Sequence, residues 1–147
     1  MKRKIIAYKD YYQKFFKAQD AATQEKILYG MLLLKTQERL PSKFVKPIHD
    51  GLFELRIEWQ GNIYRIFFCF DEGQVVVLFN CFQKKSQKTP TKEINKALKL
   101  KAEYEERKKT WRYLTLMLSW MQHSAKREAQ SVWLLRKGPV LSSQDRL

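Results

Sequence analysis

The chain has 147 residues, which is enough for one domain with a single core and short for two ordinary domains. Hydrophobic residues make up 44% of it and aromatic residues 14%, a composition that excludes a disordered basic tail. Lys and Arg number 29 against 15 Asp and Glu, giving a formal net charge of +14 and a sequence pI near 9.8. A polyanion, and first of all a nucleic acid, is therefore the expected partner.

The sequence offers no membrane, disulfide or metal signature. No apolar run approaches the ~20 residues that a membrane span needs, and basic residues 2–4 precede only a short apolar stretch, so we expect a cytosolic protein without a membrane partner. Cys69 and Cys81 each lie in an apolar run and are expected to be buried thiols in a reducing compartment. His49 and His123 have no zinc-ligand spacing to the cysteines, so we expect no metal and no cofactor.

The first third of the chain predicts a short strand followed by two helices. Residues 4–8 are the candidate strand. Asp10 is placed to cap a helix with a core-forming aromatic stripe, made of Tyr11, Tyr12, Phe15 and Phe16. Asp20 is placed to cap a second helix, which residues 39–41 end. The apolar face of that helix consists of Ile27, Leu28, Met31, Leu32 and Leu34.

From residue 52 onward the apolar period changes from 3.6 to 2. This predicts three antiparallel strands, over residues 52–59, 63–70 and 75–82. Thr89 is then placed to cap a helix with Pro90 at its first position. The predicted fold class is α+β, with an N-terminal helical pair packed on a small antiparallel sheet and a C-terminal helix after it.

Residues 107–147 differ in composition from the rest. They hold three of the four Trp and nine basic against two acidic residues, a net +7 that is half of the total charge. The helically spaced apolar residues of this segment, which either prolong the preceding helix or form another, are Trp111, Leu114, Met117, Leu118 and Met121. We interpret residues 1–109 as one domain and 110–147 as a basic, Trp-containing extension. Its apolar face has to cover the body, dimerise, or occupy a groove that a partner would otherwise use.

One face of the predicted sheet collects cations. A two-residue first loop allows two registers, one with Arg56 directly opposite Arg65 and one with Glu58 opposite Arg65. The first register pairs like charges, which costs stability unless an anion sits against them. A second two-residue loop would place Asn80 opposite Arg65 and carry Lys84 onto the same face. We therefore expect one face packed by helices and the other charged and exposed.

Three blocks of the sequence carry a family resemblance. They are residues 51–56 (GLFELR), 64–66 (YRI) and 82–90 (FQKKSQKTP), the last a basic loop suited to phosphate oxygens. Their order and spacing resemble the phage-derived Gp49-like, HigB-type branch of the RelE toxin superfamily, over about residues 4–109. The resemblance implies a RelE-like fold, ribosome-dependent cleavage of mRNA, and neutralisation by a cognate helix-turn-helix antitoxin.

The resemblance also implies site residues. Arg65 and Arg56 match arginines of the family blocks, and Lys84 and Lys85 match the basic pair after the last strand, so these four are the catalytic candidates. The sequence departs from toxins that place a catalytic His or Tyr near the C-terminus, because Tyr104 has core-like helical spacing. The RNA-binding candidates are Lys43, Lys46, His49, Asn80 and Lys88.

The chemistry implied is attack of an RNA 2′-hydroxyl on the adjacent phosphate. It needs proton removal, stabilisation of the phosphate charge and protonation of the leaving oxygen, but no metal. Arg65 and Arg56 would hold the phosphate, and Lys84 or Lys85 would move protons. Two alternatives from other classes remain open, namely a non-catalytic RNA- or DNA-binding module and an interaction protein whose role is its complex with an antitoxin.

Overall fold

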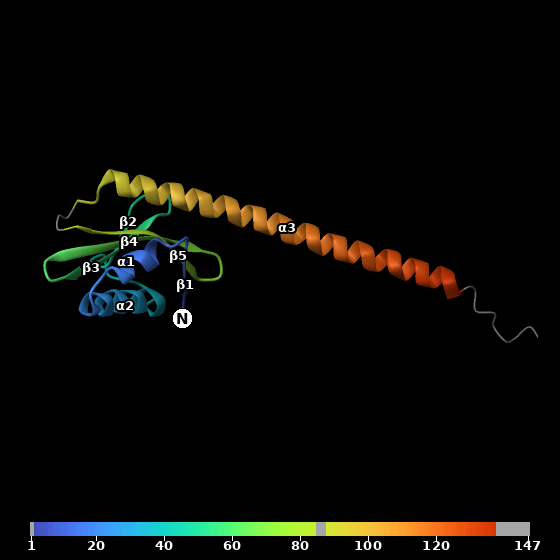
Figure 1. The fold of residues 1–147 in the computed structure, drawn as a ribbon, viewed down its shortest axis with the longest axis horizontal. Coiled ribbons are helices and arrows are strands. Elements are labelled where there is room, and N and C mark those ends of the chain that lie inside the picture. Colours follow the sequence, from blue (N-terminus) through green and yellow to red (C-terminus); the bar gives the residue numbers. More distant parts are fainter. Residues whose placement is uncertain (1, 85–87, 138–147) are drawn as a thin grey trace, which may run out of the picture. The chain divides into compact units, whose positions relative to one another are not determined.

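The computed structural model describes residues 2–84 and 88–137, and these fall into two compact units that divide between Glu105 and Glu106. The first unit contains a sheet, two helices and the beginning of a third helix, and the rest of that helix belongs to the second unit (Figure 1). The elements in chain order are β1 (Lys4–Ala7), α1 (Tyr11–Lys17), α2 (Ala21–Thr36), β2 (Val45–Pro47), β3 (Phe53–Trp59), β4 (Asn62–Asp71), β5 (Val75–Lys84) and α3 (Thr91–Lys137).

The strands form one sheet in the order β1-β5-β4-β3-β2. The predicted antiparallel meander is confirmed as its centre, made of β3, β4 and β5. The predicted N-terminal strand is confirmed as well, as an edge strand parallel to β5. The short antiparallel strand β2 at the other edge was not predicted. The α+β class inferred from the change of period is therefore correct.

The turn between β3 and β4 selects one of the two registers left open by the sequence. Gln60 and Gly61 have φ of 50° and 73°, the left-handed conformation that a two-residue type I′ hairpin requires at both positions. Trp59 therefore pairs with Asn62, and Arg56 pairs directly with Arg65.

The β4–β5 pairing differs from the expected one in two places. Its loop has three residues rather than two, so Asp71 pairs with Val75. A β-bulge near Ile66 then shifts the register by one more residue. Arg65 consequently faces Phe82, and the predicted pairing of Arg65 with Asn80 is wrong.

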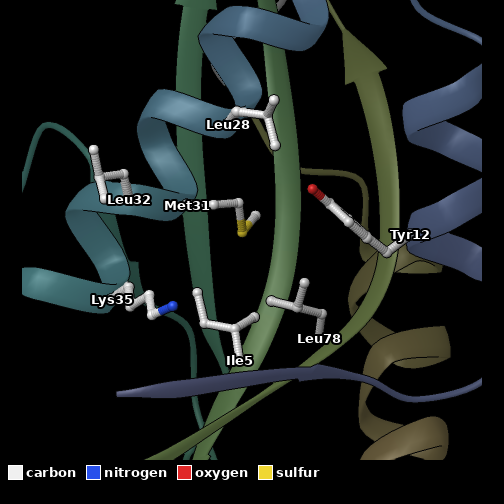
Figure 2. A pocket seen from close by; sticks show the side chains of 7 residues that line it. All are labelled: Ile5, Tyr12, Leu28, Met31, Leu32, Lys35 and Leu78. Carbon is white, nitrogen blue, oxygen red and sulfur yellow. The ribbon is translucent and has the colours of Figure 1, made fainter. Parts of the chain in front are cut away.

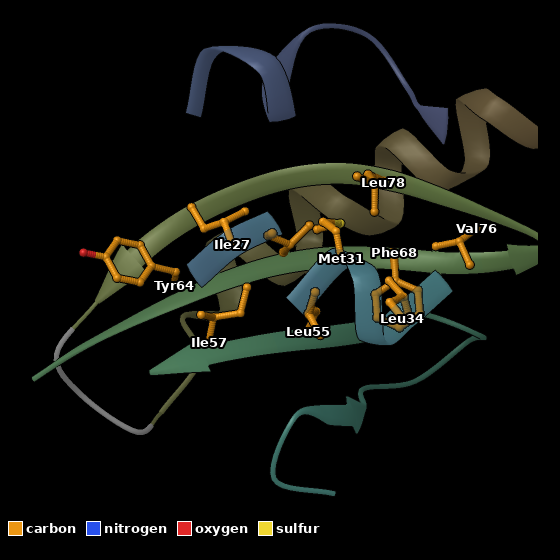
Figure 3. Close-up of a cluster of buried hydrophobic side chains, with 10 residues drawn as sticks. Ile27, Met31, Leu34, Leu55, Ile57, Tyr64, Phe68, Val76 and Leu78 are labelled. Carbon is orange, nitrogen blue, oxygen red and sulfur yellow. The ribbon is translucent and has the colours of Figure 1, made fainter. Parts of the chain in front are cut away.

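Both faces of the sheet are packed. Figure 3 shows side chains of α2 against one face, where the buried cluster consists of Ile27, Met31, Leu34, Leu55, Ile57, Tyr64, Ile66, Phe68, Val76 and Leu78. The first turns of α3 cover the other face, where the buried cluster consists of Leu52, Phe67, Cys69, Val77, Phe79, Ala97 and Leu100. The expected exposed, charged face is therefore wrong. The large apolar side chains on this second face have to be shielded from water, and the first turns of α3 cover them.

The ends of α2 show one predicted cap and one unpredicted cap. Asp20 Oδ1 accepts a hydrogen bond of 2.7 Å from the backbone amide of Thr23, as expected. At the other end the Arg3 guanidinium donates to the carbonyls of Leu34, Gln37 and Glu38 at 2.8, 2.5 and 2.8 Å. A cation on these last carbonyls stabilises the helix C-terminus. α2 ends at Thr36, earlier than the predicted stop at residues 39–41.

Smaller expectations from the sequence have mixed outcomes. Asp10 stands at the N-cap of α1, but its carboxylate pairs with Lys14 at 2.9 Å and makes no capping hydrogen bond. Cys69 is buried and Cys81 half-buried, neither is in a disulfide, and burial raises the pKa of Cys81 to about 12. Within the described ranges, no helix has an apolar stretch long enough to cross a bilayer.

Gly30 of α2 lies close against Ile57 of β3. A β-carbon there would lie 2.8 Å from Cδ1 and 3.0 Å from Cγ1 of Ile57. We expect Gly30→Ala to lower the free energy of unfolding by about 1 kcal/mol, because the overlap with Ile57 outweighs the gain in helix propensity. Ile57→Val removes the nearest atom, so the double variant should lose at least ~0.5 kcal/mol less than the sum of the single variants in urea unfolding. Additive losses of stability would show that a β-carbon at residue 30 does not clash with Ile57.

Candidate functional site

A buried carboxylate, that of Glu54 on β3, lies on the sheet face that α3 covers. Glu54 and Arg65 are both 0% exposed, and Arg56 beside them retains 17% of its side-chain surface. Glu54 Oε1 accepts hydrogen bonds from Arg56 Nε at 2.8 Å and from Arg65 Nη1 at 3.3 Å. The like-charged pair of one of the two possible registers is therefore present, and the anion that lies against it, Glu54, belongs to the chain itself.

Thr89 closes this cluster from the segment that leads into α3. Its hydroxyl donates to Glu54 Oε2 at 2.6 Å and accepts a hydrogen bond from Arg65 Nη1. The prediction that Thr89 caps the helix is wrong, because α3 begins at Thr91 and the carbonyl of Pro90 accepts from the amides of Glu93 and Ile94. The Thr89 hydroxyl instead ties the approach to α3 to the sheet.

Four residues thus form what we call the Glu54 cluster, namely Glu54, Arg56, Arg65 and Thr89. It contains two guanidinium groups and one carboxylate, so it holds an excess positive charge. Burial lowers the pKa of Arg65, and the neighbouring Glu54 carboxylate opposes that shift. Arg56 keeps part of its side chain exposed, so this positive charge can act on a molecule in the solvent.

Asn80 lies on the same sheet face but is held by α3. Because of the bulge, the consecutive residues Phe79 and Asn80 both face this helix. Asn80 Nδ2 donates to the Glu93 carboxylate at 2.9 Å and to the Glu93 carbonyl at 3.2 Å. Asn80 is 1% exposed, and its predicted contact with RNA stays a prediction.

The remaining site candidates are not gathered at one place. Lys84 is half-buried at the end of β5, opposite Ile63 and on the same face as the Glu54 cluster. His49 is exposed near the other end of β3, with Nδ1 2.9 Å from Asp50 Oδ2. Lys43 and Lys46 are exposed at and just before the edge strand β2.

Two lysines belong to the loop between β5 and α3. Lys88 is exposed next to Thr89. Lys85 lies outside the described residues, so its predicted catalytic role stays a prediction.

Tyr104 takes a structural place. Its hydroxyl donates to Asp71 Oδ2 at 2.5 Å, and its ring makes edge contacts with Tyr8 and Phe79. Burial raises the pKa of Tyr104, with the Asp71 hydrogen bond as the second cause. These contacts support the interpretation of Tyr104 as a core residue.

A hollow of about 330 Å³ lies between β1, α1 and α2 (Figure 2). Its lining is apolar apart from Lys35 and the Tyr12 hydroxyl. Leu28 and Leu32 at its rim are 53% and 54% exposed, so the predicted apolar face of α2 is only partly buried. The hollow has no pair of groups suited to acid–base chemistry. In the part of the chain that the structure describes, no three His, Cys, Asp or Glu residues converge as metal ligands.

A family model agrees with the resemblance seen in the sequence. The family model for phage-derived Gp49-like proteins (DUF891) matches residues 14–102, and the chain belongs to this family. A solved structure, the archaeal RelE–RelB complex from Pyrococcus horikoshii OT3, is similar over 60% of this chain and 100% of that chain, with 14% sequence identity and a TM-score of 0.44. No curated protein matches the sequence.

Burial of the Glu54 cluster gives a direct stability prediction. Arg65→Ala should lower the free energy of unfolding by about 3–5 kcal/mol, because it leaves Glu54 buried without one of its cationic partners. Lys92→Ala, on the exposed first turn of α3, should change it by less than ~0.5 kcal/mol. Chemical denaturation of the two variants and the parent provides the measurement. An Arg65→Ala protein as stable as Lys92→Ala would contradict the structural role of Arg65.

Proposed function

We propose that this protein is an RNA-cleaving toxin, a ribosome-dependent mRNA endonuclease held inactive by a cognate helix-turn-helix antitoxin. The observation that carries the proposal is Arg56, a partly exposed arginine that a buried carboxylate holds in place within a cluster of net positive charge. Membership of the Gp49-like family and the match of its sequence blocks to RelE/HigB-type toxins support the same function. The formal charge of +14 suits a polyanionic substrate.

The proposed chemistry is attack of the 2′-hydroxyl on the adjacent phosphorus, with departure of the 5′-oxygen of the next nucleotide. Arg56 stabilises the charge on the phosphate oxygens. Arg65 is a positioning residue, because it is fully buried and acts on Arg56 through their shared partner Glu54. Lys84 or Lys85 removes the proton from the 2′-hydroxyl or supplies one to the leaving oxygen.

The first turn of α3 and the residues before it add to the positive surroundings. Lys88 and Lys92 are exposed on either side of the point where the helix begins. The helix N-terminus itself carries partial positive charge. A phosphate held by Arg56 would therefore meet further cations along the path into α3, which suits a polynucleotide better than a small ligand.

Expression of the protein should arrest growth by blocking translation, and co-expression of its antitoxin should relieve the arrest. Arg56→Lys keeps a cation against Glu54 but loses the planar guanidinium fork. We expect it to lower mRNA cleavage by ~10²–10³-fold with little change in melting temperature. Lys35→Ala, at an exposed lysine of α2 on the opposite face of the sheet, should cleave within a few-fold of the parent. Primer-extension mapping of mRNA breaks on purified ribosomes measures both variants.

A non-catalytic RNA-binding module would give a different result in the same assay. Both variants would then weaken ribosome or RNA binding by modest and similar factors, and intact mRNA would be recovered after incubation with the parent protein. That outcome would refute the enzymatic function.

The proposed mechanism also fixes the products and the cofactor requirement. Cleavage through the 2′-hydroxyl leaves a 2′,3′-cyclic phosphate or a 3′-phosphate on one fragment and a 5′-hydroxyl on the other. Because the chemistry is assigned to Arg and Lys side chains, we expect the rate to be unchanged by 1,10-phenanthroline, which chelates transition metals and leaves the magnesium of the ribosomes in place. Products with a 3′-hydroxyl and a 5′-phosphate would contradict this mechanism.

A further inference from the structure

The second unit consists of the part of α3 that follows Glu105, and it carries an apolar stripe. In the first unit, Ala97, Leu100 and Tyr104 of α3 follow an alternating spacing of three and four residues and pack on the sheet. The same spacing continues through the second unit. The stripe there consists of Trp111, Leu114, Leu118, Met121, Ala125 and Val132.

All of these second-unit stripe residues are exposed. Trp111 is 68% exposed, Leu118 59% and Met121 54%. A spacing of three and four residues sustained over three heptads is that of a coiled-coil seam, in which apolar side chains pack against a partner helix. An apolar stripe of this length on a helix in water calls for such a partner.

Most cations between residues 109 and 132 lie at outward positions, which they share with the exposed apolar side chains of Tyr113, Leu116 and Trp120. Lys109, Arg112, Lys126 and Arg127 occupy the outward heptad positions b, c and f when Trp111 is at position a. Lys108 flanks the seam at position e beside Arg107, and the other flanking positions carry uncharged residues, namely Thr110, Thr115, Met117, Gln122, Ser124, Ala129 and Ser131. The cations therefore do not prevent two such helices from packing together along the stripe.

Two charged residues lie within the repeat itself, and their signs are opposite. Arg107 and Glu128 both occupy position d and are three heptads apart, one near each end of the stripe. A parallel pair of identical helices would set Arg107 beside Arg107 and Glu128 beside Glu128. An antiparallel pair brings the Arg107 end of each helix to the Glu128 end of the other, which replaces both repulsions by attractions.

We propose that this stripe is the dimerisation surface of the protein, on which the same segment of a second copy packs in the antiparallel direction. The stripe supplies the buried apolar surface, and the Arg107–Glu128 pairs supply the direction. The net positive charge of each helix opposes association, so dimerisation strengthens as salt screens that repulsion. An acidic protein partner, RNA or an anionic lipid surface would show the opposite dependence on salt.

Two leucines of the helix provide a matched test. Leu118 lies in the stripe, whereas Leu116 lies two residues away at outward position f, and they are 59% and 64% exposed. Leu118→Glu should raise the dimer dissociation constant of the full-length protein by at least ~100-fold, because each dimer loses two packed leucines. Leu116→Glu should change it by less than about threefold. Sedimentation equilibrium at two salt concentrations measures both variants, with circular dichroism to verify the helix.

The direction of pairing has its own test. Glu128→Lys should weaken the dimer by about tenfold, and adding Arg107→Glu in the same chain should restore it, because the exchanged charges again lie in adjacent layers at the same end of an antiparallel pair. In a parallel pair the second change would not restore the first. A parent protein that stays monomeric at 100 µM and high salt, or equal effects of the two leucine variants, would overturn the proposal, as would a monomer that binds anionic vesicles.

Discussion

The sheet face that α3 covers depends on the hydrogen bonds that the buried carboxylate of Glu54 accepts. The type I′ turn at Gln60 and Gly61 forces Arg56 and Arg65 into directly opposed positions on neighbouring strands. Without an anion between them, that register would place two cations side by side under a helix. Glu54 bridges both guanidinium groups, and its second oxygen receives the Thr89 hydroxyl. One side chain thus stabilises the register of two strands and fixes the point from which α3 starts.

The structure gives Arg56 and Arg65 different environments, although the sequence analysis makes both of them catalytic candidates of the same kind. Arg65 has no exposed surface and serves the fold, whereas Arg56 shares the same carboxylate and still reaches solvent. A functional arginine at the position of Arg65 can therefore influence a substrate only through the geometry of its neighbours. An Arg65 variant is therefore expected to lose activity mainly because its fold is destabilised. Stability and cleavage have to be measured on the same variant for this reason.

Features that depend on local sequence could be predicted, and features that depend on distant contacts could not. The alternation of period 2 located the three central strands, and Asp20 caps α2 because the interaction spans only three residues. Thr89 also has the local sequence of a helix cap, but its hydroxyl donates instead to the buried carboxylate of Glu54, 35 residues away in the sequence. The exposed face was mispredicted for a similar reason, since the alternating pattern shows that a face carries cations but not that a later helix will cover it.

Glu54 and Thr89 are 35 residues apart in the sequence, and this separation affects when the Glu54 cluster can form during synthesis on the ribosome. The edge strand β1 pairs with Val75–Leu78, and the Glu54 cluster is complete only when Thr89 arrives, so neither can form while the middle of the chain is still being made. The arginine assigned to the substrate acquires its final support late, after nearly the whole first unit has emerged. A nascent chain with an unfinished first unit therefore lacks the organised arginine centre while it is still attached to a translating ribosome.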